Sequence, residues 1–210
     1  MSSVAACTVI YRPTLHHFGV TTQRLHEMGE WYGNVLGTVS NHATAQPLGS
    51  VYGMSVSAAF VSNDRANHRI AIFSLAALQD DANKHGHAKL QHVAFEYATL
   101  DEFLGSYART KGLGIEPVYA TDHGPTIAFY YEDPDGNSVE LFVDNFGNWD
   151  KSTEYVRISP EFAANPMGTP VDPDKLVAAR QAGMSFEELQ RQAYAGEFPP
   201  ARPMDPRRLF

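Results

Sequence analysis

The same sequence pattern occurs twice in this chain, and the repeat strongly limits the folds that it can adopt. Residues 15–20 read LHHFGV and residues 90–95 read LQHVAF, each with a leucine, one residue, a histidine and then an apolar residue. A helical pattern and three strand-like stretches follow each segment. Because internal repetition of this size fixes the architecture of a chain, we predict two βαβββ modules, at residues 14–77 and 90–144.

The elements of both modules follow from the periodicity of their apolar residues. In the first module we predict a strand, a helix with Thr22 as N-cap, and three further strands, over residues 15–22, 23–35, 38–46, 51–62 and 67–75. A polar break at 78–89 comes next. The second module has a strand, a helix with the capping box Thr99–Glu102, another strand and a hairpin, over residues 90–97, 99–111, 115–120 and 126–143.

We therefore predict an α+β fold, in which two βαβββ modules form a cupped mixed sheet around a metal site. Each module is expected to place its helix on one sheet face, while the other face carries His, Gly, Ala and Thr, which are small or polar. Residues 1–144 form this domain, and an apolar arm at 1–13 is expected to add a strand.

Residues 145–210 form a C-terminal extension with a different composition. The stretch at residues 144–171 is predicted to be loop-like because of its spaced prolines. Two short helices are predicted at 172–182 and 185–195, each preceded by an N-cap candidate. The Pro-rich tail beyond them either packs over the domain or a neighbouring subunit, or stays solvated.

Composition narrows the classes of function. The net charge of −8 and the pI of about 5.5 argue against a nucleic-acid surface. The single cysteine, Cys7, excludes an internal disulfide and a cysteine-based zinc site. No apolar run is long enough to span a bilayer, and the N-terminus does not resemble a signal peptide, so we expect a cytoplasmic protein without a membrane partner.

Glu140 is a carboxylate within an otherwise apolar strand, and such a group is costly to bury without a compensating cation or donor. Side chains alternate along a strand, so Glu140 shares a face with Phe142 and not with its apolar neighbours. His17 and His92 hold equivalent places in the first strands of the two modules. Two imidazoles and one carboxylate form the ligand set of non-haem Fe(II) oxygenases, so we predict a site for Fe(II), with Mn(II) as the alternative.

At these motifs the sequence resembles the vicinal-oxygen-chelate superfamily, which includes glyoxalase I, bleomycin-resistance proteins and type I extradiol dioxygenases. The segments LHHFGV, LQHVAF and DPDGNSVEL carry the resemblance, which covers residues 14–144. The last motif is common to most members and identifies the fold only. The isomerase branch typically carries a second acid in the first module, where this chain has Ala71, so a three-ligand site is implied.

Finer motifs resemble one-domain extradiol dioxygenases. NHRIAIF maps a catalytic histidine to His68, and DHGPTIAFYY maps His123 and Tyr130. The resemblance implies that His123 is the acid–base group, that His68 stabilises bound oxygen, and that Tyr130 hydrogen-bonds the substrate. The parallel with LQHVAF selects His17 over the adjacent His16 as the metal ligand.

The resemblance thus implies an Fe(II)-dependent extradiol dioxygenase that cleaves a catechol-type diol with O2 in aromatic catabolism. Its partners would be the diol and O2, and we expect a homo-oligomer. Two alternatives remain open: a glyoxalase-like isomerase or thiol transferase, which needs no O2, and a non-catalytic binding or resistance protein of the same fold.

Overall fold

The computed structural model describes residues 12–44, 50–51 and 54–209 of the 210-residue chain. Among these residues, no helix is both long and apolar enough to cross a membrane. The chain divides into two compact units, one of residues 1–25 and 38–78 and the other of residues 26–37 and 79–210. Each unit contains one mixed sheet, and this confirms the predicted α+β class.

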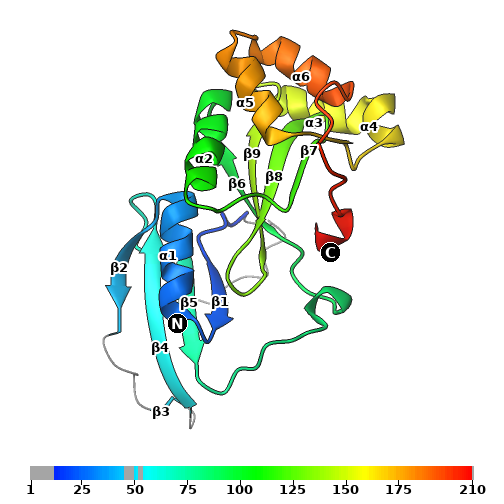
Figure 1. Cartoon of the computed structure of the whole chain (residues 1–210). Helices are drawn as coiled ribbons and strands as arrows, with labels where there is room; N and C mark the ends of the chain where they lie inside the picture. Colours follow the sequence, from blue (N-terminus) through cyan, green and yellow to red (C-terminus); the bar gives the residue numbers. More distant parts are fainter. Residues whose placement is uncertain (1–11, 45–49, 52–53, 210) are drawn as a thin grey trace, which may run out of the picture. The chain divides into compact units, whose positions relative to one another are not determined.

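The first unit has a sheet in the strand order β1–β5–β4–β2, with β3 paired to β4 (Figure 1). Its strands are β1 (Phe18–Thr22), β2 (Val39–Ala43), β3 (Ser50–Val51), β4 (Met54–Ser62) and β5 (Ile70–Leu75). β1 runs parallel to β5 and places Gly19 opposite Ala71. β4 runs antiparallel to β5 and places Phe60 opposite Ala71, so these three residues share one sheet face.

The second unit has a sheet in the order β10–β7–β8–β9–β6. Its strands are β6 (Val93–Tyr97), β7 (Tyr119–Asp122), β8 (Thr126–Glu132), β9 (Ser138–Asp144) and β10 (Thr169–Pro170). β6 runs parallel to β9 and places Ala94 opposite Glu140. β8 runs antiparallel to β9 and places Tyr130 opposite Glu140.

The two sheets repeat the same strand order and register, as the sequence repeat predicts. Ala71 and Glu140 take the same place, each on the last strand of its module and each paired in parallel with the first strand. His17 and His92 also correspond, because each lies two residues before the first-strand residue that forms this pair. The register therefore supports the choice of His17 over His16 as the equivalent of His92.

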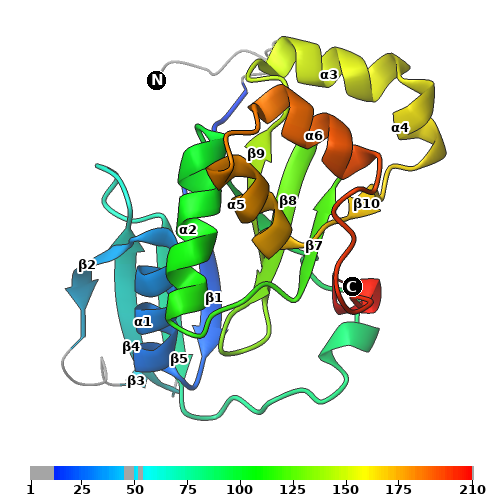
Figure 2. The same cartoon turned by 45° about the horizontal axis from the view of Figure 1, so that its top comes forward.

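The two helices of the repeats are α1 (Leu25–Leu36) and α2 (Leu100–Gly112). Thr99 caps α2, and its side chain accepts a hydrogen bond from the Glu102 amide, as the capping box predicts. α2 covers one face of the second sheet, where the ring of Phe103 lies 4.3 Å from that of Phe129 between centroids. Figure 2 shows α2 in front of this sheet, beside α5 (Pro173–Gln181). Glu140 lies on the opposite face of the sheet, which α2 does not cover.

The hairpin between β8 and β9 is fixed by the carboxylate of Asp133, which is 4% exposed. It accepts hydrogen bonds from the backbone amides of Asp135 and Asn137, at 3.0 and 2.8 Å. The hydroxyl of Tyr32, on α1, donates to the same carboxylate at 3.0 Å. Gly136 adopts a φ of 73°, which explains why the turn contains glycine at this point. The turn therefore sets the register that places Tyr130 opposite Glu140.

The C-terminal extension corrects one prediction. Residues 144–171 were expected to be loop-like, but they contain α3 (Trp149–Ile158) and α4 (Pro160–Ala164). Both helices begin at a capping side chain, and α3 ends at Ile158, before the first of the spaced prolines from which a loop was predicted. Asn148 caps α3, and Pro160 occupies the first turn of α4, where the missing N–H of proline costs nothing.

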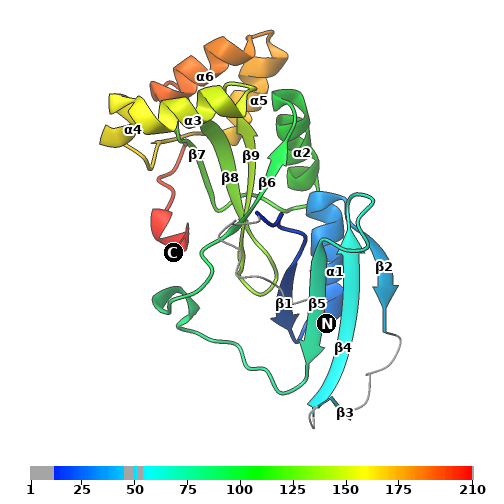
Figure 3. The ribbon, with the colours of Figure 1, turned by 180° about the vertical axis from the view of Figure 1, so that it is seen from behind.

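The other helices of the extension agree with the sequence. α5 begins after its cap Asp172, and α6 (Phe186–Tyr194) begins after its cap Ser185. The tail then crosses back to the sheet and ends in a short 3-10 turn, η2 (Pro206–Leu209), which contacts β7 (Figure 3). Another 3-10 turn, η1 (Lys84–Gly86), lies in the polar break.

Most predicted strands are present but begin later than expected. β1 starts at Phe18, β6 at Val93 and β7 at Tyr119, each three or four residues after its predicted start. The apolar arm at 1–13 falls almost wholly outside the described residues.

Candidate active site

In the second unit, four of the predicted site residues form one continuous chain of polar contacts. His92 Nε2 lies 2.9 Å from Glu140 Oε2, and the Tyr130 hydroxyl donates to Glu140 Oε1 at 3.1 Å. The same hydroxyl lies 3.0 Å from His123 Nε2. The sequence separates these residues by up to 48 positions, from 92 to 140, and the parallel pairing of β6 with β9 brings them together.

His92 makes one polar contact through each ring nitrogen. Nδ1 pairs with the side-chain amide of Gln91, and Nε2 faces the carboxylate of Glu140. An imidazole nitrogen that carries a hydrogen donates it to a carboxylate, whereas a deprotonated nitrogen offers its lone pair to a metal ion. The donor set of an imidazole nitrogen and a carboxylate fits a divalent metal.

The Glu140 carboxyl is nearly enclosed, because its side chain is 10% exposed, whereas that of His92 is 31% exposed. Buried carboxylates require compensation, and here the neighbours are one imidazole and one phenol. Burial and the adjacent Glu140 raise the pKa of Tyr130 far above its ordinary value, so this phenol keeps its proton.

Tyr130 has one hydrogen to share between two acceptors, Glu140 and His123. His123 Nδ1 lies 3.3 Å from the carbonyl oxygen of Pro166, to which it can only donate. When Tyr130 donates to Glu140, His123 Nε2 must therefore carry a proton in order to donate to Tyr130. Burial lowers the pKa of His123, and the nearby Glu140 raises it in part. The site can thus hold or release one proton at His123 Nε2.

Asp122 precedes His123 and is fully buried. Its Oδ1 accepts from the Gly124 amide at 2.7 Å and from Asn145 Nδ2 at 3.1 Å, while Oδ2 is buried without a hydrogen-bond partner among the described residues. Burial outweighs these hydrogen bonds and raises the pKa of Asp122 to about 7. Gly168 packs so closely here that an added Cβ would lie 2.2 Å from the Asp122 carbonyl oxygen.

In the first unit, the structure brings His16, His17 and His68 together. The rings of His17 and His68 lie 4.3 Å apart between centroids, and one nitrogen from each of the three side chains lies within 4.8 Å of the others. His68 is half-buried, and this burial, followed by the electrostatic influence of His17 and His16, lowers its pKa. Neutral imidazoles with free lone pairs are the form that binds a metal.

An apolar wall flanks Tyr130 on the same sheet face. Tyr119, Ala128 and Tyr130 form a buried cluster, against which Phe142 and Met204 pack. Met204 belongs to the Pro-rich tail, and no periodicity or motif in the sequence points to it. Four further histidines are exposed: His26, His42, His85 and His87.

Comparison with known proteins places the chain in a family. The model of the Glyoxalase/Bleomycin resistance protein/Dioxygenase superfamily matches residues 14–141. The chain therefore belongs to this superfamily, as its motifs predict.

Two curated relatives extend the similarity across nearly the whole chain. Biphenyl-2,3-diol 1,2-dioxygenase 2 of Rhodococcus globerulus is 34% identical over 191 residues, which cover 91% of this chain and 94% of that protein. Biphenyl-2,3-diol 1,2-dioxygenase 3 of the same organism is 33% identical over 183 residues, which cover 87% of this chain and 90% of that protein.

A solved structure shows the same fold. The glyoxylase/bleomycin resistance protein/dioxygenase domain from Frankia sp. EAN1pec aligns with a TM-score of 0.50 and 13% identity. The alignment covers 64% of this chain and 93% of that domain. At this identity the similarity concerns the fold alone.

Proposed function

We propose that this protein is an extradiol dioxygenase, which cleaves the aromatic ring of a catechol-type diol with O2 in the catabolism of aromatic compounds. The observation that carries the proposal is the similarity, along nearly the whole chain, to two proteins named biphenyl-2,3-diol 1,2-dioxygenase. This similarity confirms the activity class predicted from the sequence motifs. The connected polar residues His92, Glu140, Tyr130 and His123 supply metal-ligand and proton-transfer groups of the type that such a reaction needs.

His17, His92 and Glu140 are the proposed metal ligands, with Fe(II) as the metal and Mn(II) as the alternative. The 2.9 Å approach of His92 Nε2 to Glu140 Oε2 supports two of them. His17 occupies the place in its module that His92 occupies in the other. When bound, the metal would act as a Lewis acid that lowers the pKa of one diol hydroxyl and as a template for the diol.

The remaining residues would transfer a proton and donate hydrogen bonds to oxygen atoms. His123 Nε2 would accept the proton that the diol gives up and later return it, because burial lowers the pKa of this imidazole and so favours the neutral form that can take up a proton. Tyr130 keeps its proton and would donate a hydrogen bond to a substrate oxygen. His68, which burial favours in its neutral form, would donate a hydrogen bond to oxygen.

The glyoxalase-like alternative is less well supported. Ala71 holds the place in the first sheet that Glu140 holds in the second, so the first module offers no carboxylate at the equivalent position. A metal site with two imidazoles and one carboxylate leaves coordination positions open for both hydroxyl oxygens of a chelating diol and for O2.

We further propose the organisation of the chain and of its assembly. Residues 1–144 would form the vicinal-oxygen-chelate domain, with modules at 14–77 and 90–144, and residues 145–210 would form a C-terminal extension. The protein is proposed to act in the cytoplasm as a homo-oligomer.

A direct experiment combines metal loading with turnover. The protein is reconstituted anaerobically with Fe(II), mixed with biphenyl-2,3-diol or catechol, and exposed to air, and the yellow semialdehyde product is followed by absorbance. Glu140→Ala should lose both bound iron and turnover, whereas the control Glu96→Ala, which removes an exposed carboxylate from β6 of the same sheet, should keep both. Stoichiometric iron without any coloured product from either diol would contradict the proposal.

A further inference from the structure

The C-terminal tail reaches the sheet face that carries the candidate active site. Met204 packs against the buried cluster of Tyr119, Ala128 and Tyr130. Its sulfur accepts a hydrogen bond from the backbone amide of Ala120, at 3.2 Å, on β7. Met204 therefore contacts β7 at the backbone amide of Ala120 and packs against the cluster that includes Tyr119 of the same strand.

The sheet register places this contact beside the proposed chemistry. Ala128 lies opposite Phe142, and Tyr130 lies opposite Glu140, on neighbouring strands. Residues two apart on a strand share a face, so Met204 covers the face that carries Glu140. Phe129, between Ala128 and Tyr130, points to the other face, where it packs on α2.

The tail is held in place along its length. Phe198 is buried, and its carbonyl oxygen accepts from the Asp172 amide at 2.8 Å. Lys175 Nζ donates to the Pro199 carbonyl at 2.6 Å. Near its end, Arg208 forms an ion pair with Glu132, the last residue of β8. A segment rich in proline and fixed at both ends presents Met204 with little loss of chain entropy.

We propose that Met204 is a wall of the diol pocket and selects the substituent that the diol carries. The inference rests on the proposed function, because it assigns the apolar part of that substrate to this face. The hydroxyls of a catechol would face Glu140 and Tyr130, and its ring carbons need an apolar surface. Phe142 and Met204, which are half-buried, offer one, and a thioether packs well against an aromatic ring.

Met204 is suited to limiting size because it is the component of this wall that belongs to no strand. Tyr119, Ala128 and Phe142 are fixed by the sheet, whereas Met204 is only half-buried and comes from the tail. Shortening it opens space next to Ala128 for a second ring, and enlarging it closes that space.

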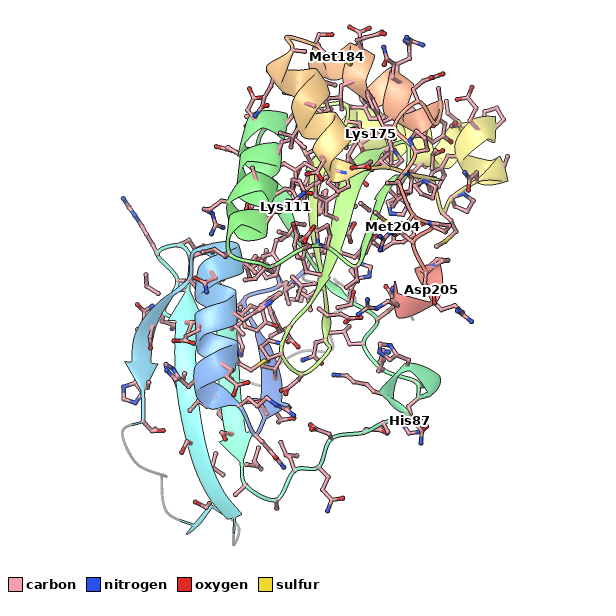
Figure 4. All side chains as sticks on the ribbon, in the orientation of Figure 1. His87, Lys111, Lys175, Met184, Met204 and Asp205 are labelled. Atoms are coloured by element: carbon pink, nitrogen blue, oxygen red, sulfur yellow. The ribbon has the colours of Figure 1, made fainter. Side chains whose placement is uncertain are left out.

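The test measures binding and turnover separately. Dissociation constants for catechol and for biphenyl-2,3-diol are measured anaerobically by calorimetry on the metal-loaded full-length protein. Met204→Ala should shift the preference toward biphenyl-2,3-diol by about fivefold or more, and Met204→Trp should shift it toward catechol by about tenfold. The matched control is Met184→Ala, a methionine of the same extension that lies between α5 and α6 (Figure 4).

A second pair of variants tests the tail without altering the wall. Arg208→Ala removes the ion pair to Glu132 on β8, whereas Arg207→Ala removes a pair that stays within the tail, with Asp205. Arg208→Ala should weaken the discrimination between the two diols, and Arg207→Ala should leave it at the wild-type value. This pair remains informative even when Met204→Ala lowers the melting temperature.

The outcomes separate this inference from the proposed function. If substitution of Met204 changes diol affinity but no variant cleaves the ring, the proposed activity is overturned and the role of Met204 in the diol pocket is supported. Ring cleavage with the same diol preference in the Met204, Arg208 and control variants would support the activity and overturn the wall. Failure of both diols to bind the wild-type protein would overturn both.

Discussion

Asp122 makes the stability of this protein depend on pH in a way that can be calculated. Burial raises the pKa of this carboxyl from 3.8 to about 7 in the folded state. The folded state therefore favours the neutral form. The contribution of Asp122 to stability is fully present below its unfolded pKa and is lost as pH rises through about 7.

The size of this effect follows from the shift. A difference of about three pKa units corresponds to about 4 kcal/mol in total, of which roughly 2.5 kcal/mol falls between pH 5 and pH 8. Asp122→Asn keeps an oxygen that can accept from Gly124 and Asn145 but cannot ionise. The variant should therefore avoid this loss of stability at alkaline pH.

Urea denaturation at pH 5 and pH 8 provides the assay. Between these two values, the wild-type free energy of unfolding should fall by about 2.5 kcal/mol more than that of Asp122→Asn. Other titrating groups are the same in both proteins and cancel in the comparison. The exposed residue Asp150, changed to Asn, should follow the wild type. Parallel curves for wild type and Asp122→Asn would refute the assignment of a neutral buried carboxyl.

Three further substitutions test the site and its support. Tyr32→Phe removes a donor to the buried carboxylate of Asp133 and should lower the free energy of unfolding by about 1.5–3 kcal/mol, measured in urea. Tyr130→Phe should retain bound metal, assayed by elemental analysis, while kcat falls because the substrate loses a hydrogen bond; an unchanged kcat would exclude that role. His123→Gln should lower kcat by about 10²–10⁴-fold with metal content unchanged. The wild-type acid limb of kcat/KM should lie below pH 6.5, because burial lowers the pKa of His123, and His123→Gln should abolish it.

The sequence was sufficient to predict the repeat, since the spacing of apolar residues around LHHFGV and LQHVAF requires it. It also placed Glu140 on the face opposite Leu141, because side chains alternate along β9. The parallel between the two modules could then be tested by register, and Ala71 does hold the place of Glu140.

The spaced prolines of residues 144–171 led to a loop prediction, but α3 begins at its cap Asn148 and ends at Ile158, before these prolines. Other features depend on tertiary contacts that leave no local pattern. Met204 lies among prolines, and only the return of the tail to β7 gives it neighbours. The raised pKa of Asp122 results from its complete burial, and the sequence Asp122-His123-Gly124 does not predict that burial.

The activity itself is tested most directly by the fate of molecular oxygen. The Fe(II)-loaded protein is supplied with biphenyl-2,3-diol under ¹⁸O2, and the ring-opened product is analysed by mass spectrometry. The proposed function predicts a single product that carries both labelled atoms of O2. A product with one labelled atom or none, or oxygen consumption that yields peroxide with the ring intact, would contradict it.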